Sequence, residues 1–190
     1  MQEERNLRWS KRVTITLAVV ACVALLGFGL HRHHYPHGLK SGKLTTFVGL
    51  LSGYALEHNG WFPRGGTTPL ASLQELYPSY CVEGLGLAGM SGNERKTLHW
   101  LKNGKVIDET ISSWVYHPGF RSDDNPEIAI IWESEGGIFV NGSRSDGHAV
   151  GFADGGYAQI ASKDWPAFLK RQEELRNEVL LKRTNSAEQR

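Results

Sequence analysis

The sequence predicts an α+β protein with an N-terminal transmembrane helix, followed by a head that has one packing helix, an antiparallel sheet and a C-terminal helix. Three observations lead to this fold. An uncharged apolar run covers Val13–Leu30. Apolar residues recur with helical spacing over 44–58 and again from residue 164. Between these two segments, short runs alternate with a period near two, which is typical of strands.

The apolar run predicts a membrane anchor. At about 1.5 Å per residue, Val13–Leu30 spans roughly 27 Å as a helix, near the thickness of the hydrocarbon core of a bilayer. Four basic residues precede the run, and short basic flanks favour the cytoplasm. We therefore expect residues 1–12 inside, 13–30 spanning the inner (cytoplasmic) membrane once, and the bulk of the chain in the periplasm or outside the cell.

Other interpretations of the run fit less well. A cleaved signal peptide has a shorter apolar region with a small-residue cleavage site, and no A-x-A follows here. A buried core helix needs a polar stripe, which this run lacks. The residues before Cys22 resemble a lipobox, although apolar residues continue after it. Lipidation at Cys22 is therefore left open.

Charge balance and cysteine content exclude some binding partners and cross-links for the chain. The 21 basic and 20 acidic residues of the whole chain nearly balance and form no basic patch, so nucleic acid is not an expected partner. Cys81 is the one cysteine outside the apolar run, which excludes a disulfide within the chain.

The joint at residues 31–43 holds four histidines, and the pattern suggests either a metal site or a belt at the lipid headgroups. We favour the belt, with Tyr35 and Arg32 as interfacial anchors. Pro36 and Gly38 should end the membrane helix. The histidines are His31, His33, His34 and His37.

The globular domain is expected over 44–163. It should open with a helix at Leu44–His58, ended by Asn59-Gly60, and a short helix that begins at Thr68 or Pro69. Asn103-Gly104 and Asp154-Gly155 should turn hairpins. The predicted strands are Thr97–Lys102, Val106–Ile111, Trp114–His117, Ile128–Glu133, Gly137–Val140, Ala149–Ala153 and Tyr157–Ala161.

The C-terminal segment predicts an amphipathic helix over 164–183, capped by Ser162 or Asp164. Its apolar stripe should lie on the sheet or on a partner. Residues 184–190 are expected to be disordered.

Chemistry-bearing patterns are sparse. The sequence has no nucleophile elbow, no H-E-x-x-H, no Walker loop and no paired CxxC, so we expect no enzyme activity and no catalytic residue. One polar loop offers hard oxygen ligands that suit calcium, the one cofactor considered. The candidate ligands are Asp123, Asp124 and Glu127, joined by Asp154 if the loops converge.

Two stretches together resemble a known family. Residues 50–63, LLSGYALEHNGWFP, are similar to the segment of type II secretion pseudopilins in which a helix ends and a loop begins. Residues 149–157, AVGFADGGY, are similar to the end of prepilin-like proteins with the H-X9-DG domain. No prepilin cleavage site is recognisable, and Arg144 stands where the H-X9-DG histidine would lie. The residues that match the family motifs are Tyr54, Asn59, Gly60, Phe62, Pro63, Phe152, Asp154 and Gly155.

The resemblance implies an anchored helix, a compact α+β head and a role in assembly or surface contact. We therefore expect a membrane-anchored extracytoplasmic protein that acts through contacts with a protein partner or with itself, in a type II secretion or pilus-like assembly. The alternative is a tethered periplasmic hydrolase or sugar-binding domain. It would use His117 or His148 with Asp123, Asp124 or Asp154.

Overall fold

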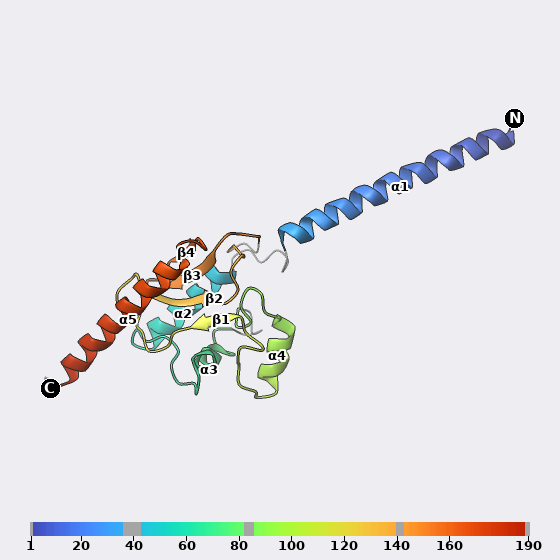
Figure 1. The fold of residues 1–190 in the computed structure, drawn as a ribbon. Helices are drawn as coiled ribbons and strands as arrows, with labels where there is room; N and C mark the ends of the chain where they lie inside the picture. Colours follow the sequence, from blue (N-terminus) through green and yellow to red (C-terminus); the bar gives the residue numbers. More distant parts are fainter. Residues whose placement is uncertain (1, 36–42, 82–85, 140–142, 189–190) are drawn as a thin grey trace.

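A computed structural model describes residues 2–35, 43–81, 86–139 and 143–188. Its first element, helix α1 (Gln2–His34), projects from the head as a rod (Figure 1). Within it, Val13–His34 is long and apolar enough to cross a membrane, and none of its residues is buried by the head. Length and composition fit a single-pass anchor or a signal sequence. The helix ends just before Pro36 and Gly38, the predicted breakers, which lie outside the described residues.

The head is built on a four-stranded antiparallel sheet in the order β1-β2-β3-β4. Four predicted strands are confirmed. The Asp154-Gly155 hairpin is confirmed as well, because Gly151 pairs with Tyr157 and the Phe152 N–H donates to the Gly156 carbonyl over 2.9 Å. The strands are β1 (Trp114–Tyr116), β2 (Ala129–Glu133), β3 (His148–Phe152) and β4 (Tyr157–Ile160).

Helix α2 (Lys43–Glu57) covers one face of this sheet, as its apolar spacing predicts. The buried side includes Leu44, Phe47, Val48 and Leu51, each at most 1 % exposed. Gly151 of β3 lets the helix approach closely, because a Cβ there would lie 2.4 Å from the Val48 side chain. Close packing of this kind excludes water from the largest apolar cluster of the head.

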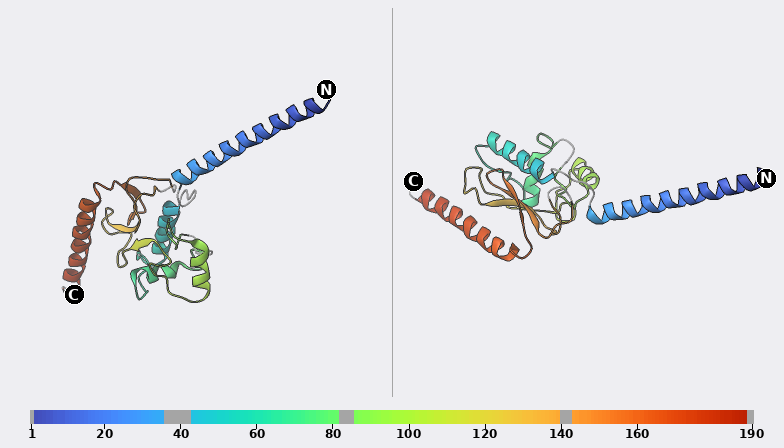
Figure 2. Two further views of the ribbon diagram at one scale, coloured as in Figure 1. Left: turned by 45° about the vertical axis from the view of Figure 1, so that its right-hand side comes forward. Right: turned by 90° about the horizontal axis from the view of Figure 1, so that it is seen from above.

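Helix α5 (Trp165–Glu188) covers the opposite face (Figure 2). A bulge in β2 makes this packing possible: Ala129 pairs with Phe152, but Ile131 pairs with Gly151. The extra residue turns Ala129 and Trp132 to the same side, where they meet side chains from the first turns of α5. The bulge also frees the Ala129 N–H, which donates to the Gln172 Oε1 of α5 over 2.7 Å.

The region 94–111 differs from its prediction. Residues 94–102 form helix α4 (Glu94–Lys102) and not a strand, since Asn93 caps the Lys96 N–H and Thr97 and Leu101 bury one face four residues apart. Asn103-Gly104 ends this helix and turns no hairpin. The predicted strand Val106–Ile111 is wrong, because these residues pair with no strand among the described residues.

Three further predicted segments can be compared with the structure. The short helix begins at Pro69 with Thr68 as N-cap, as predicted, in α3 (Pro69–Ser72) and η1 (Leu73–Leu76). Of the predicted strand 137–140, the described part makes a single bridge, from Ile138 to Arg144. Disorder over 184–190 is wrong for residues 184–188, because α5 continues to Glu188 without a breaker.

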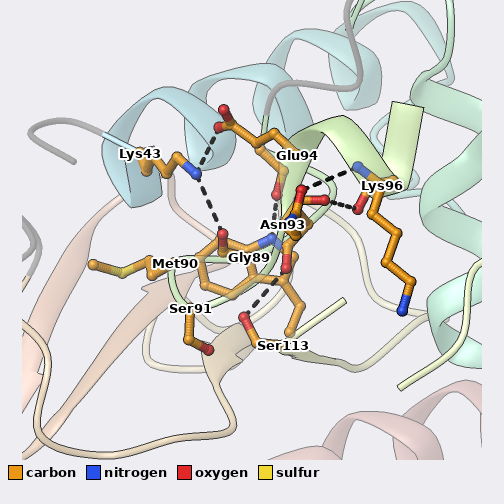
Figure 3. A network of polar contacts seen from close by, with 12 residues as sticks. Lys43, Gly89, Met90, Ser91, Asn93, Glu94, Lys96 and Ser113 are labelled. Atoms are coloured by element: carbon orange, nitrogen blue, oxygen red, sulfur yellow. Dashed lines mark hydrogen bonds and ion pairs between the residues drawn. The ribbon is translucent and has the colours of Figure 1, made fainter. Parts of the chain in front are cut away.

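A buried carboxylate fastens the glycine-rich segment 86–92 to the sheet. Glu133 at the end of β2 is fully buried and accepts the Met90 N–H over 2.7 Å and the Ser91 hydroxyl over 2.5 Å. Lys43 at the start of α2 reaches Glu94 over 2.6 Å and the Gly89 carbonyl over 3.5 Å (Figure 3). The segment is therefore a structural loop that joins α2, α4 and the sheet.

We expect Gly151→Ala to lower the free energy of unfolding by ~1–3 kcal/mol, because its methyl group would overlap Val48. Gly49→Ala is the matched control: Gly49 is exposed in the middle of α2 and a Cβ there meets nothing within 4 Å. This control should be neutral or stabilising by up to ~1 kcal/mol. Denaturant unfolding of the full chain in detergent measures both. Equal stability of the two variants would contradict the packing described.

Candidate functional site

The residues of the first family motif form the end of α2 and the turn after it. Asn59 and Gly60 adopt φ values of +54° and +83°, which reverse the chain, and the Gly60 N–H donates to Ala55 over 2.8 Å. Phe62 is fully buried. The Pro63 carbonyl accepts the Tyr116 hydroxyl of β1 over 2.7 Å. These motif residues hold the helix end against the sheet.

The turn pairs with the loop 119–127, where three of the four calcium candidates lie. The Phe62 N–H donates to Phe120 over 3.2 Å, and the Ser122 N–H donates to Gly60 over 2.8 Å. Between these bonds Trp61 and Arg121 form an antiparallel bridge. Two segments about sixty residues apart in sequence thus meet at one end of the head.

Trp61 is surrounded by guanidinium groups. The carbon atom at the centre of each guanidinium lies 3.7 Å from the ring centroid for Arg64, 4.8 Å for Arg183 and 5.4 Å for Arg121. Each contact lies within cation–π range, worth about 0.5–1 kcal/mol at an exposed site. We call Trp61, Arg64, Arg121, Lys182 and Arg183 the cationic end.

The aspartates of the loop neutralise part of this charge. Asp123 binds Arg121 through two bonds of 2.8 and 3.0 Å. Asp124 accepts the Arg121 N–H over 2.7 Å and pairs with Arg183, which also donates to the Gly119 carbonyl over 2.6 Å. An open pocket of about 780 Å³ lies beside them, lined further by Asn125, Val179, Lys182 and Ser186.

The four calcium candidates are therefore engaged by protein groups. Glu127 faces Arg171 at 3.6 Å, and Asp154 accepts the Gly156 N–H over 2.7 Å as an Asx turn of the β3–β4 hairpin. Within the described ranges, no three His, Cys, Asp or Glu side chains are grouped so that they could hold a metal ion.

The second family motif lies in the same hairpin. Phe152 ends β3 and packs edge-on against Phe168 of α5 with ring centroids 6.4 Å apart. Gly155 has φ +87°, and a Cβ there would lie 3.2 Å from the Ser52 hydroxyl of α2. The F-A-D-G residues thus form the turn of the hairpin and pack it between α2 and α5.

A second polar cluster lies at the C-terminal end of α2, around Tyr54 and Glu75. The Tyr54 hydroxyl donates to Glu75, which also accepts the Arg64 N–H over 3.0 Å. His58 stacks on Tyr54 at 3.7 Å, and the Tyr80 hydroxyl donates to Glu57 over 2.5 Å. Burial and the bond to Glu75 raise the pKa of Tyr54 well above its usual range. Tyr54 therefore stays protonated and acts here as a donor.

The two histidines of the hydrolase alternative lie beneath α5, apart from the aspartates. His117 contacts Trp132 with ring centroids 4.6 Å apart, and His148 stacks on Trp165 at 3.9 Å. Their Nε2 and Nδ1 atoms, respectively, are buried without a hydrogen-bond partner in the described structure. No contact joins either ring to Asp123, Asp124 or Asp154 in this part of the chain, so the structure does not assemble the proposed set.

Arg144, the residue that stands in place of the motif histidine, binds the end of α1. Its N–H donates to the His34 carbonyl over 2.8 Å and its Nε donates to the His33 carbonyl over 2.5 Å. These bonds satisfy two carbonyls that a helix leaves free at its C-terminus. Among the joint histidines, His31 and His34 contact the Tyr35 ring at 5.1 Å each, whereas His37 lies outside the described residues.

The sequence analysis did not identify Arg183 or Glu75, and it noted Arg144 without its contact with α1. Each acts on a segment 10 or more residues away in sequence, and no local periodicity marks Glu75 or Arg144. Arg183 continues the apolar side of α5 one turn after Val179, and this position was the one available signal.

Comparison with known protein families, with curated proteins and with solved structures finds no match for this chain.

The packing of His117 predicts a pH dependence. Burial, followed by the charge of Arg176, lowers its pKa from 6.5 to about 4. The unfolded chain therefore binds more protons between these values, and the free energy of unfolding should fall as the pH drops from about 6.5 to 4.

His117→Phe keeps an aromatic ring on Trp132 and removes this titration. We expect the variant to lose roughly 1–3 kcal/mol less stability than the natural chain between pH 7 and pH 4. Urea unfolding at a series of pH values measures the difference. Parallel curves for the two proteins would contradict the prediction.

Proposed function

We propose that this chain is a single-pass inner-membrane protein whose head lies in the periplasm or outside the cell and acts through protein contacts, in the manner of a pseudopilin. The observation that carries the proposal is helix α1, whose apolar surface is left uncovered by the head over Val13–His34. Leaving such a surface in water is strongly unfavourable, and a bilayer removes the cost.

The head supports a role in contact. Its family-motif residues bind the α2 terminus and the β3–β4 hairpin to the sheet. The cationic end follows the C-terminal end of α2 and includes the C-terminal half of α5, both on the side of the head away from α1 (Figure 1). A partner outside the membrane would meet this end first.

The cationic end also carries charge that the head does not neutralise. Arg121 and Arg183 pair with aspartates, but Arg64 and Lys182 form no ion pair within the described part of the chain. The exposed cations beside an aromatic ring suit an acidic partner surface, since Trp and Arg are enriched where proteins meet. No observation favours the hydrolase alternative over this role.

Membrane fractionation tests the anchor. Expressed in a bacterial host with two membranes, the full chain should stay in the carbonate-washed inner-membrane pellet with its N-terminal 30 residues intact. Tyr157, which is 52 % exposed, should react as Tyr157→Cys with an impermeant maleimide added to periplasm-permeable cells.

The control is the double variant Leu17→Glu and Leu25→Glu, which places two charges in the apolar run and should release the protein. Recovery of the uncut natural chain in the soluble fraction would contradict the proposal that α1 anchors the protein in the membrane. Removal of the run by cleavage would show a signal sequence.

Crosslinking tests the contact surface. A photoreactive residue placed at Lys182 should form a discrete adduct in cells, and Arg64→Glu should reduce its yield several-fold because the charge of the surface is reversed locally. The matched control is the same photoreactive residue at Glu109, an exposed position in the loop after α4. Equal adduct patterns at the two positions would contradict a contact at the cationic end.

A further inference from the structure

We propose that a pocket at the C-terminal end of α2 binds the guanidinium group of an arginine side chain carried by a partner protein. The pocket is open and has a volume of about 630 Å³. Its lining residues differ from those of the cationic end, so the inference rests neither on the anchor nor on the contact proposed there. The pocket is lined by Tyr54, Glu57, His58, Glu75, Ser79 and Tyr80.

Three rings gather at the wall of the pocket. His58 stacks on Tyr54 with ring centroids 3.7 Å apart and ring planes inclined by 3°. Tyr80 meets both rings edge-on, with its centroid 5.3 Å from that of Tyr54 and 6.2 Å from that of His58. Tyr54 is 6 % exposed, so a ligand meets chiefly the rings of His58 and Tyr80. The face of a tyrosine ring attracts cations, and a planar guanidinium stacks on it.

Two carboxylates make the pocket acidic. Glu75 already accepts the Tyr54 hydroxyl and the Arg64 N–H. Glu57 accepts the Tyr80 hydroxyl over 2.5 Å through Oε2, and the described residues supply no hydrogen bond to its Oε1. Neither carboxylate forms an ion pair within the described ranges. The pocket therefore presents a negative charge and an acceptor oxygen to a ligand.

The acceptor oxygen and the ring lie next to each other, because the Tyr80 hydroxyl itself binds Glu57. A guanidinium can stack on the ring and donate an N–H to the carboxylate at the same time. A quaternary ammonium has no N–H to donate, and the compact ammonium of lysine has no planar face. These properties select arginine among organic cations.

Charge also distinguishes an arginine within a peptide from the free amino acid. Free arginine carries an α-carboxylate, which Glu57 and Glu75 would repel at short range. An arginine within a peptide chain lacks that charge. The occupant that fits the pocket is therefore a side chain on the surface of a partner protein.

Saturation-transfer NMR tests the inference on the full chain in phosphatidylcholine nanodiscs at pH 8, with empty nanodiscs subtracted. The probes are N-acetylarginine amide, N-acetylcitrulline amide, which has nearly the same shape without the charge, and free arginine. We expect the arginine amide to bind with a Kd on the order of 1 mM, as suits so small a ligand. The other two probes should bind several-fold more weakly. Equal binding of the arginine and citrulline amides would overturn the recognition of charge, and equal binding of free arginine would overturn the assignment to a partner protein.

Two variants locate the binding. Glu57→Gln removes the charge and keeps an oxygen that can accept the Tyr80 hydroxyl, and Tyr80→Leu removes the ring face. Each should raise the Kd of the arginine amide several-fold. Glu109→Gln, at an exposed position in the loop after α4, is the matched control and should leave the Kd unchanged. Urea unfolding establishes that each variant is folded. A Kd that stays the same in folded Glu57→Gln would overturn the proposal.

Discussion

The head depends on covering both faces of a single four-stranded sheet. α2 can cover one face only because Gly151 presents no side chain where Val48 arrives. α5 can cover the other only because the β2 bulge turns Ala129 and Trp132 outward together and frees an N–H for Gln172. The two devices act on neighbouring strands. A change at either one leaves apolar surface in water, at roughly 25 cal/mol per Å².

The sequence predicted the elements whose pattern is local. Period-two runs located β1 to β4, helical spacing located α2 and most of α5, and Asp154-Gly155 located the hairpin. It failed at 97–111, because Thr97 to Lys102 is short and its capping by Asn93 outweighs an alternation that reads as strand. The prediction for the end of α5 was also wrong. Its polar residues were interpreted as a disordered tail, although none of them stops a helix and α5 continues to Glu188.

The candidate site was only partly predictable, since its parts come from distant segments. The motif turn and the acidic loop were both singled out, but nothing local shows that Trp61 bridges Arg121 or that Arg183 reaches Asp124. Because of those contacts, the predicted calcium ligands Asp123 and Asp124 form ion pairs with arginines instead. Charge pairing across the fold, which one sequence does not reveal, thus decides what the acidic loop can bind.

The two bonds from Arg144 to the end of α1 have a mechanical consequence. They oppose rotation of the head relative to α1, so a lateral force on the head would be transmitted to this helix as a torque. Each bond contributes only about 1 kcal/mol net. The coupling therefore restrains the angle between the head and α1 only weakly, and a modest load would break it.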